Sequence, residues 1–213
     1  VIVIMLTLAA CVAKPAENTD ASDTSDTSDT SEPEASKADE VTADVAVPAF
    51  NKEFNLQDVH FVVNASNTGS INSLTITPSG LSEVNDIITR EIDGTVTNAE
   101  VADINADGSP EIYVWVNSVG SGGYASPIGY SANKKKSLSE IYFTPISDDP
   151  VNSKGYAGHD EFAVVEGVIA QRFPLYGENN TNAAPTGKTR QLQYKLTRGE
   201  AGWVMKLDRV TEF

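Results

Sequence analysis

The sequence is poor in the residues that build disulfide frameworks and the common metal or redox centres. Its 213 residues include one cysteine, Cys11, and two histidines, His60 and His159. A single cysteine forms no disulfide within the chain, and it leaves no CxxC redox motif and no zinc-ligand spacing. The glycine-rich phosphate-binding motif of nucleotide-binding proteins is absent as well.

Basic residues are also scarce. The chain has 15 Lys and Arg against 30 Asp and Glu, a net charge of −15. Residues 12–46 hold ten acids and two bases, a charge of −8, which leaves −7 for residues 47–213. An acidic domain without a basic stripe is a poor nucleic-acid binder. It suits a cationic protein partner, because opposite net charge speeds encounter.

No apolar run is long enough to span a bilayer. Residues 1–10 (VIVIMLTLAA) are almost wholly apolar, and we interpret them as the remnant of a secretory signal peptide. The run ends in Leu-Ala-Ala-Cys11, which resembles the lipobox of bacterial lipoproteins, where the cysteine carries the lipid. Because Val12 rather than Asp follows it, we expect a periplasmic protein anchored by lipid to the outer membrane.

Residues 11–47 lack the apolar side chains of a folded core. Residues 22–30 repeat Ser-Asp-Thr three times, and the surrounding stretch contains no aromatic residue through Val47. Such a segment cannot bury enough apolar surface to offset the entropy lost on ordering. We therefore predict a disordered acidic linker that follows the lipidated Cys11. The folded domain is then expected over residues 48–213.

Strand-like runs alternate with turn residues throughout that domain. The clearest runs are 59–63, 73–77, 112–116, 138–143 and 161–169, and a hairpin joins 191–196 to 203–207. In 112–116, Ile112, Val114 and Val116 share one face, as a period of two requires. Helical periodicity is confined to Leu81–Thr89. The pattern predicts an all-β fold, an antiparallel β-sandwich or flattened barrel.

One acidic loop has the spacing of a calcium site. Asp103, Asn105, Asp107 and Glu111 place oxygen atoms at alternate positions around Gly108. The loop is not an EF-hand, since its twelfth position is Val114. It resembles the shorter calcium loops of some β-propeller repeats. The alternative, which we favour, is an Asx-rich turn in which these side chains accept backbone N–H groups.

A glycine-rich loop follows the strand 112–116 directly. Residues 119–127 read VGSGGYASP, and the glycines give the backbone freedom for unusual conformations. We expect the loop to project from the sheet, with Ser121 and Tyr124 near its tip. Tyrosine is a frequent interface anchor. The alternative is a hairpin turn with Tyr124 folded back on the sheet.

Ser121 lacks the surroundings of a catalytic nucleophile. Gly120-Ser121-Gly122 is not the Gly-x-Ser-x-Gly elbow. His60 lies in a strand-like run, and His159 and its neighbour Asp160 face opposite ways on an extended chain. We therefore expect no enzyme.

From about Phe54 to Phe213 the chain resembles the periplasmic inhibitors of invertebrate-type lysozyme. The resembling stretches are LTITPSGL (74–81), EIDGTVTNAEVADINADGSPEIYVWV (91–116), SVGSGGYASPIGYSANKKKSLSEIY (118–142), KGYAGHDEFAVVEG (154–167), RFPLYGENNTNAAPTGKTRQLQYKL (172–196) and GEAGWVMKLDRVTEF (199–213).

The resemblance implies a binding protein that blocks the lysozyme and so protects peptidoglycan. In this family a Ser-Gly-x-Tyr loop enters the catalytic cleft, which corresponds here to Ser121, Gly122, Gly123 and Tyr124. Lys136 in the basic run 134–136, His159 and the 181–187 region are candidates for supporting contacts, and the favoured alternative for the basic run is a solvated turn. The resemblance also leads us to expect that two copies of the domain can pair. The alternative function is a calcium-dependent envelope adhesin or wall-associated module that uses the 103–111 loop.

Overall fold

The computed structural model describes residues 49–177 and 184–213. The signal remnant, the lipidated Cys11 and the acidic linker all fall on residues 1–48, which lie outside the described residues, and so do residues 181–183 of the expected contact region. The described chain forms strands joined by turns and one short 3-10 helix. The strands are β1 (Phe50–Leu56), β2 (Val59–Ala65), β3 (Ile71–Ser79), β4 (Ile88–Asp93), β5 (Thr95–Ala102), β6 (Glu111–Asn117), β7 (Ala125–Asn133), β8 (Ser137–Phe143), β9 (Glu161–Val165), β10 (Val168–Pro174), β11 (Thr189–Arg198) and β12 (Trp203–Glu212), and the 3-10 helix is η1 (Ile146–Asp148). In these two ranges no helix is long and apolar enough to cross a membrane.

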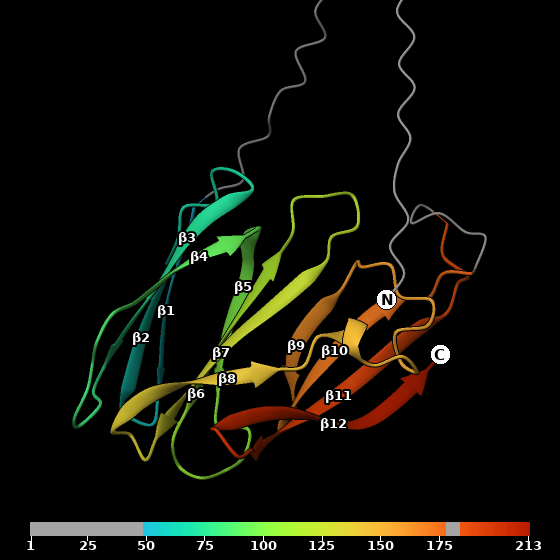
Figure 1. Ribbon diagram of the computed structural model, residues 1–213. Coiled ribbons are helices and arrows are strands. Elements are labelled where there is room, and N and C mark those ends of the chain that lie inside the picture. The colour runs from blue at the N-terminus through green and yellow to red at the C-terminus, as the bar shows by residue number, and fades with distance from the viewer. Residues whose placement is uncertain (1–48, 178–183) are drawn as a thin grey trace, which may run out of the picture. The chain divides into compact units, whose positions relative to one another are not determined.

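The strands form two sheets, which confirms the predicted all-β fold. A four-stranded antiparallel sheet has the order β1-β2-β3-β4, and an eight-stranded sheet has the order β5-β6-β7-β8-β12-β11-β10-β9. Figure 1 shows the smaller sheet, in blue-green to green, beside the β5 end of the larger one. One apolar cluster lies between the smaller sheet and β5–β7, and a second lies on the other face of β6, among residues of β8 and β10–β12.

The larger sheet curls until its two edge strands nearly meet, so it is a nearly closed barrel. Glu100 on edge strand β5 accepts a hydrogen bond from the backbone N–H of Val164 on edge strand β9, at 3.1 Å. The same carboxylate oxygen accepts the indole N–H of Trp115 at 2.7 Å. This curvature covers N–H and C=O groups of the edge strands, which in an open sheet would be free to pair with a strand of another chain.

Strand β6 is buried on both faces, and the predicted alternation explains why. Ile112, Val114 and Val116 belong to the cluster beneath the smaller sheet, whereas Tyr113 and Trp115 belong to the cluster inside the barrel. The two aromatic rings stack with centroids 5.8 Å apart. A strand buried on both sides is a rigid base for the loop that follows it.

One expected strand was wrong in detail, and one stretch with helical periodicity does not form a helix. The run 161–169 is not one strand but the hairpin of β9 and β10, because Glu166 and Gly167 both adopt positive φ (45° and 79°) and form a two-residue turn. Residues 81–87 form no helix. The N–H groups of Ser82 and Glu83 donate instead to the carbonyls of Lys135 and Lys136.

One pairing in the larger sheet is parallel, an exception to the predicted antiparallel order. Strands β8 and β12 pair only from Ile141 opposite Trp203 to Phe143 opposite Met205. Beyond Phe143 the chain leaves β12 and enters η1. The two strands are therefore unpaired beyond Phe143 and Met205.

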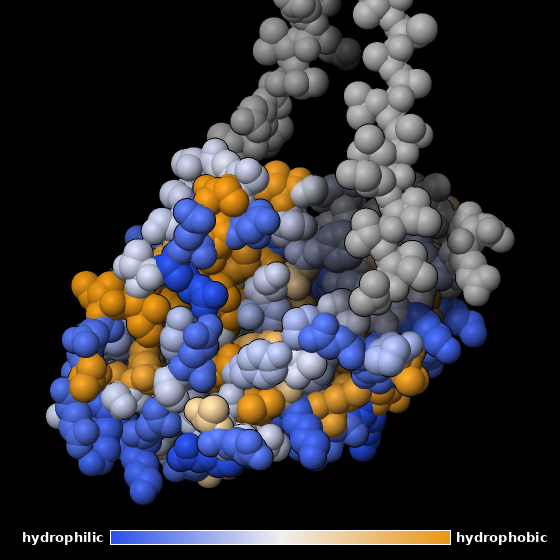
Figure 2. Space-filling view, viewed as in Figure 1, coloured by the Kyte–Doolittle hydropathy of each residue, from blue (hydrophilic) through white to orange (hydrophobic). Residues whose placement is uncertain are grey.

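Exposed hydrophobic side chains are spread over the surface. On the face shown in Figure 2 they occur in several separate groups between hydrophilic residues. The most exposed large ones are Ile71, Ile87, Val119, Tyr142, Val151 and Phe213. Val119 belongs to the glycine-rich loop.

Candidate functional site

The glycine-rich segment is the connection between β6 and β7. The last strand pair is Asn117 opposite Ala125, so residues 118–124 form the loop. Figure 1 shows it extending past the ends of both strands. Ser118 closes its base, because its N–H donates to the carbonyl of Tyr124 at 2.9 Å and its hydroxyl accepts the N–H of Tyr124 at 3.0 Å.

Residues 156–160 support the loop from outside the hairpin. The N–H of His159 donates to the carbonyl of Gly122 at 2.6 Å. The carboxylate of Asp160 accepts the N–H of Ala125 at 3.1 Å, just where β7 begins. We call residues 156–160 the buttress. The Gly122 carbonyl and the Ala125 N–H thus tie the loop to a segment about 35 residues further along the chain.

The close approach of these segments depends on two glycines. A Cβ atom at Gly158, whose φ is +86°, would collide with the carbonyl oxygen of Gly122. A Cβ atom at Gly122 would collide with the ring of Tyr124. Gly158 therefore needs glycine both for space and for its positive φ, whereas Gly122 needs it for the space that the Tyr124 ring occupies.

Asp160 is the centre of a buried hydrogen-bond network. Its side chain is almost completely buried, and it accepts the Tyr156 hydroxyl and the Gln171 amide, each at 2.6 Å. Gln171 in turn accepts the Tyr194 hydroxyl at 2.9 Å. Burial raises the pKa of the Asp160 carboxyl, although its hydrogen bonds act in the opposite direction. Burial also raises the pKa of Tyr156, with a further contribution from Asp160.

The two side chains expected at the loop tip are accessible. Ser121 is exposed, and Tyr124 keeps 46% of its surface exposed. The Tyr124 ring meets the ring of Tyr156 edge to face, with centroids 5.7 Å apart. Tyr124 is therefore neither free in solvent nor folded flat on the sheet, and its orientation is set by the buttress.

Of the two expected supporting residues, the structure brings one to the loop. His159 is part of the buttress, and it is exposed, with a positive φ of 58°. Lys136 lies in the turn after β7, at the opposite end of that strand from the loop. There it forms an ion pair with Glu83 at 2.6 Å.

The serine has no catalytic partner among the described residues. No hydrogen bond joins Ser121 to His159 in this part of the chain, and the Asp160 carboxylate is occupied by Ala125, Tyr156 and Gln171. His60 lies on β2 of the other sheet. The arrangement offers hydroxyl groups for recognition rather than an activated nucleophile.

The acidic loop before β6 has the hydrogen bonds of an Asx-rich turn. The Asp103 carboxylate accepts the N–H groups of Asp107 and Gly108, and Asp107 accepts that of Ser109. The Asn105 amide donates to Asp107 at 3.1 Å. Across residues 49–177 and 184–213, no group of three or more His, Cys, Asp or Glu is placed to hold a metal ion. Calcium binding stays a prediction, and the adhesin alternative gains no support from this arrangement.

Glu111 is the buried member of that acidic loop. It is fully buried and accepts the N–H of Ile104 at 3.0 Å and the hydroxyl of Ser131 at 3.1 Å. Burial raises its pKa from 4.5 to about 7, and the neighbouring charge of Asp103 adds to the effect. Its place is structural, since it joins the acidic loop to β7.

Of the buttress, the sequence pointed only to His159. Tyr156, Asp160 and Gln171 meet the loop through the fold, and local patterns carry no signal for such long-range contacts. One hint was present: Gly155 and Gly158 flank Tyr156, and glycines at this spacing suggest a tight backbone approach.

Comparison with known proteins bears on this same region. Residues 80–154 match the family model of the periplasmic lysozyme inhibitor of I-type lysozyme. The match contains the whole 118–124 loop, and it confirms the resemblance over these residues. No curated protein and no solved structure matches the chain at a significant level.

Proposed function

We propose that this chain inhibits invertebrate-type lysozyme by inserting the 118–124 loop into the active-site cleft of the enzyme. The observation that carries the proposal is the loop itself. It lies within the segment that matches the inhibitor family, it projects past β6 and β7, and it exposes Ser121 and Tyr124. The matched family is one of inhibitors and not of enzymes.

The chemistry of the target supports the choice of these two side chains. Lysozyme uses a pair of carboxyl groups, one protonated and one ionised. A serine hydroxyl both donates and accepts, so Ser121 is suited to lie between the two carboxyls in the place of the scissile oxygen or of water. The phenol ring of Tyr124 is suited to the sugar-binding groove beside them.

The buttress favours tight binding because it fixes the loop before the enzyme arrives. Freezing a mobile loop on binding costs free energy that is subtracted from affinity. Here the hydrogen bonds from His159 to Gly122 and from Ala125 to Asp160 already hold both sides of the tip. The acidic domain would in addition speed encounter with a cationic lysozyme.

The family name places its members in the periplasm. We propose that this protein acts there while held to the outer membrane through a lipid on Cys11. In that position it would meet a lysozyme that has crossed the outer membrane and keep it from peptidoglycan. Changing Cys11 to Ser should release the protein in soluble form. Pairing of two copies of the domain stays a prediction.

The proposal is tested by substituting the two tip side chains. We expect Ser121→Ala and Tyr124→Ala each to weaken inhibition of an invertebrate-type lysozyme by about 1–3 kcal/mol, or roughly 5- to 150-fold in Kd. The measurement is the inhibition constant in a cell-wall lysis assay.

A matched control is Ser73→Ala, an exposed serine on β3 of the other sheet. It should inhibit like the unchanged protein. Undiminished inhibition by both tip variants, with their folding intact, would remove the loop from the mechanism.

A further inference from the structure

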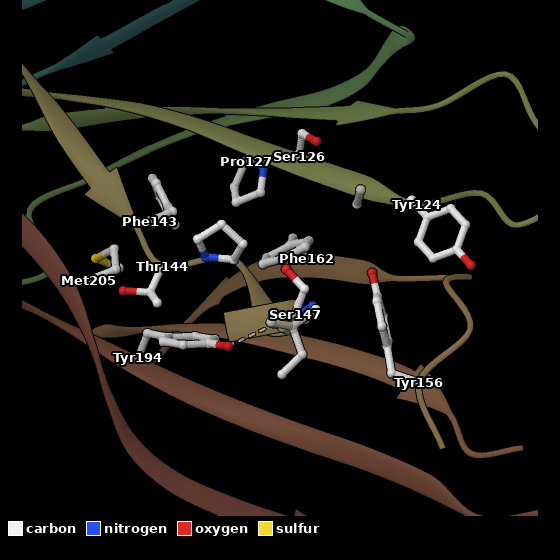
Figure 3. Close-up of a pocket in the computed structure, with 14 residues that line it drawn as sticks. Tyr124, Ser126, Pro127, Phe143, Thr144, Ser147, Tyr156, Phe162, Tyr194 and Met205 are labelled. Carbon is white, nitrogen blue, oxygen red and sulfur yellow. Dashed lines mark hydrogen bonds between the residues drawn. The ribbon is translucent and has the colours of Figure 1, made fainter. Parts of the chain in front are cut away.

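A pocket of about 370 Å³ opens directly beside the proposed inhibitory loop. Figure 3 shows the rings of Tyr124 and Tyr156 at one end of it, and Phe143 and Met205 at the other. Its size falls within the range of sites that bind small molecules or single side chains. The function proposed above does not use it.

The early separation of β8 from β12 creates this pocket. The two strands pair only as far as Phe143 and Met205, and the chain then passes through Thr144 and Pro145 into η1. Residues 144–147 therefore line the pocket where β8 and β12 no longer pair. Gln171 and Tyr194 line the pocket from the strands across it.

The lining determines which chemical group fits. No charged residue lines the pocket, and most of its surface is apolar, from side chains such as Pro127, Ile146 and Phe162. The polar atoms of Gln171 and Tyr194 are already bonded to each other at 2.9 Å. A charged group would lose hydration here without meeting an opposite charge among the lining residues. The pocket therefore suits an uncharged, apolar group.

The loop and the pocket form one continuous surface. Tyr124 belongs to both, and Ala125, Ser126 and Pro127 continue the pocket wall along β7. A stable protein complex covers about 800 Å² on each partner, which is more than a seven-residue loop supplies. An enzyme seated over the loop must therefore cover neighbouring surface, and the pocket mouth is next to the tip.

We propose that this pocket receives an uncharged apolar side chain of the lysozyme from the edge of its active-site cleft. The inference rests on the inhibitory function proposed above and names a second anchoring point for the same partner. In such an interface a protruding side chain in a desolvated pocket contributes much of the binding energy. The loop would block the cleft while the pocket fixes the position of the enzyme.

A substitution that fills the pocket tests this role. Ser147 is exposed and lines the pocket, so Ser147→Trp places an indole in its mouth. We expect at least tenfold weaker inhibition of the lysozyme, with an unchanged circular dichroism spectrum. The matched control is Ser73→Trp, which adds the same indole to the other sheet and should leave inhibition unchanged. Full inhibition by Ser147→Trp would overturn the proposal.

A second measurement needs no substitution. The sequence contains two methionines, Met5 and Met205, and Met205 is buried in the pocket wall near Phe143 and Tyr194. In protein labelled with ¹³C at the methionine methyl groups, we expect the Met205 resonance to shift when the lysozyme is added. A resonance that stays fixed with the enzyme but moves with cyclohexanol would assign the pocket to free small molecules and overturn the proposal.

The two proposals fail in distinguishable ways. If Ser121→Ala and Tyr124→Ala inhibit normally, the loop mechanism is wrong. If those variants are weak but Ser147→Trp inhibits fully and Met205 does not respond, only the pocket loses its role.

Discussion

At the scale of single residues, the most unusual group is the carboxyl of Glu111. It is fully buried, and it accepts hydrogen bonds from the Ile104 N–H and the Ser131 hydroxyl. These bonds do not compensate for the lost hydration, so its pKa rises to about 7. The folded protein therefore binds a proton at this site more tightly than the unfolded chain does.

This shift predicts that stability depends on pH. Between about 4.5 and 7 the folded state holds the Glu111 proton while the unfolded state has lost it, so the free energy of unfolding falls as pH rises. The full effect of a shift of this size is about 3 kcal/mol. Urea unfolding in calcium-free buffer at several pH values measures it.

The control for this effect is Glu111→Gln, which does not titrate. Its amide oxygen is able to accept the Ile104 N–H, and its NH₂ group is able to donate to Ser131. The decline in stability across this pH window should be smaller in the variant. Equal slopes in the two proteins would show that Glu111 does not titrate as described.

At the scale of structural elements, the loop and the buttress act as one unit. Asp160 accepts hydrogen bonds from Ala125, Tyr156 and Gln171, and without its carboxylate all three donors lose their acceptor. Buried donors without partners cost about 1–3 kcal/mol each. The geometry of the loop therefore depends on a side chain that is itself too buried to touch a partner.

Asp160→Ala should uncouple the loop from the buttress. We expect the unfolding free energy to fall by about 2–4 kcal/mol and inhibition to weaken more than tenfold. Relative to the unchanged protein, amide hydrogen exchange should accelerate more at Gly122–Ala125 than in the strands of the other sheet. A uniform loss of stability would not produce this difference.

Asp160→Asn is the matched variant, because asparagine has nearly the same shape as aspartate. Its side-chain oxygen can still accept hydrogen bonds, and its NH₂ group can donate to Gln171 if the Gln171 amide flips. It should inhibit more strongly than Asp160→Ala. Normal inhibition and unchanged exchange in Asp160→Ala would show that the loop holds its shape without the buttress.

The sequence allowed prediction of the elements with strong local patterns. Alternation identified β6 and assigned its faces, and the turn at 198–202 identified the β11–β12 hairpin. The run 161–169 was misread as one strand because its two-residue turn carries a single glycine, Gly167. The helical pattern at Leu81–Thr89 failed because contacts with the 134–136 turn take up its backbone N–H groups.

The candidate site was predictable only in part. Ser121 and Tyr124 became candidates because glycines surround them and because the chain resembles a known family. Tyr156 and Asp160 were not found, since about 35 residues of chain separate them from the loop and only the tertiary fold brings them to it. The pocket depends on where β8 leaves β12, and no local pattern shows that point.

At the scale of the whole molecule, the fold turns a short loop into a fixed projection. Strand β6 is buried between two apolar clusters, and the barrel nearly closes through Glu100 and Val164. The loop leaves this rigid wall, and the buttress, which leads directly into β9, holds its tip. Insertion into an enzyme cleft would then require little reorganisation of the inhibitor.

The central claim is that Ser121 and Tyr124 occupy the catalytic cleft of an invertebrate-type lysozyme. A crystal structure of the complex tests it most directly. We expect the Ser121 hydroxyl within hydrogen-bond distance of the two catalytic carboxyls, and the Tyr124 ring in the adjoining sugar groove. A complex in which the 118–124 loop lies outside the cleft would contradict it.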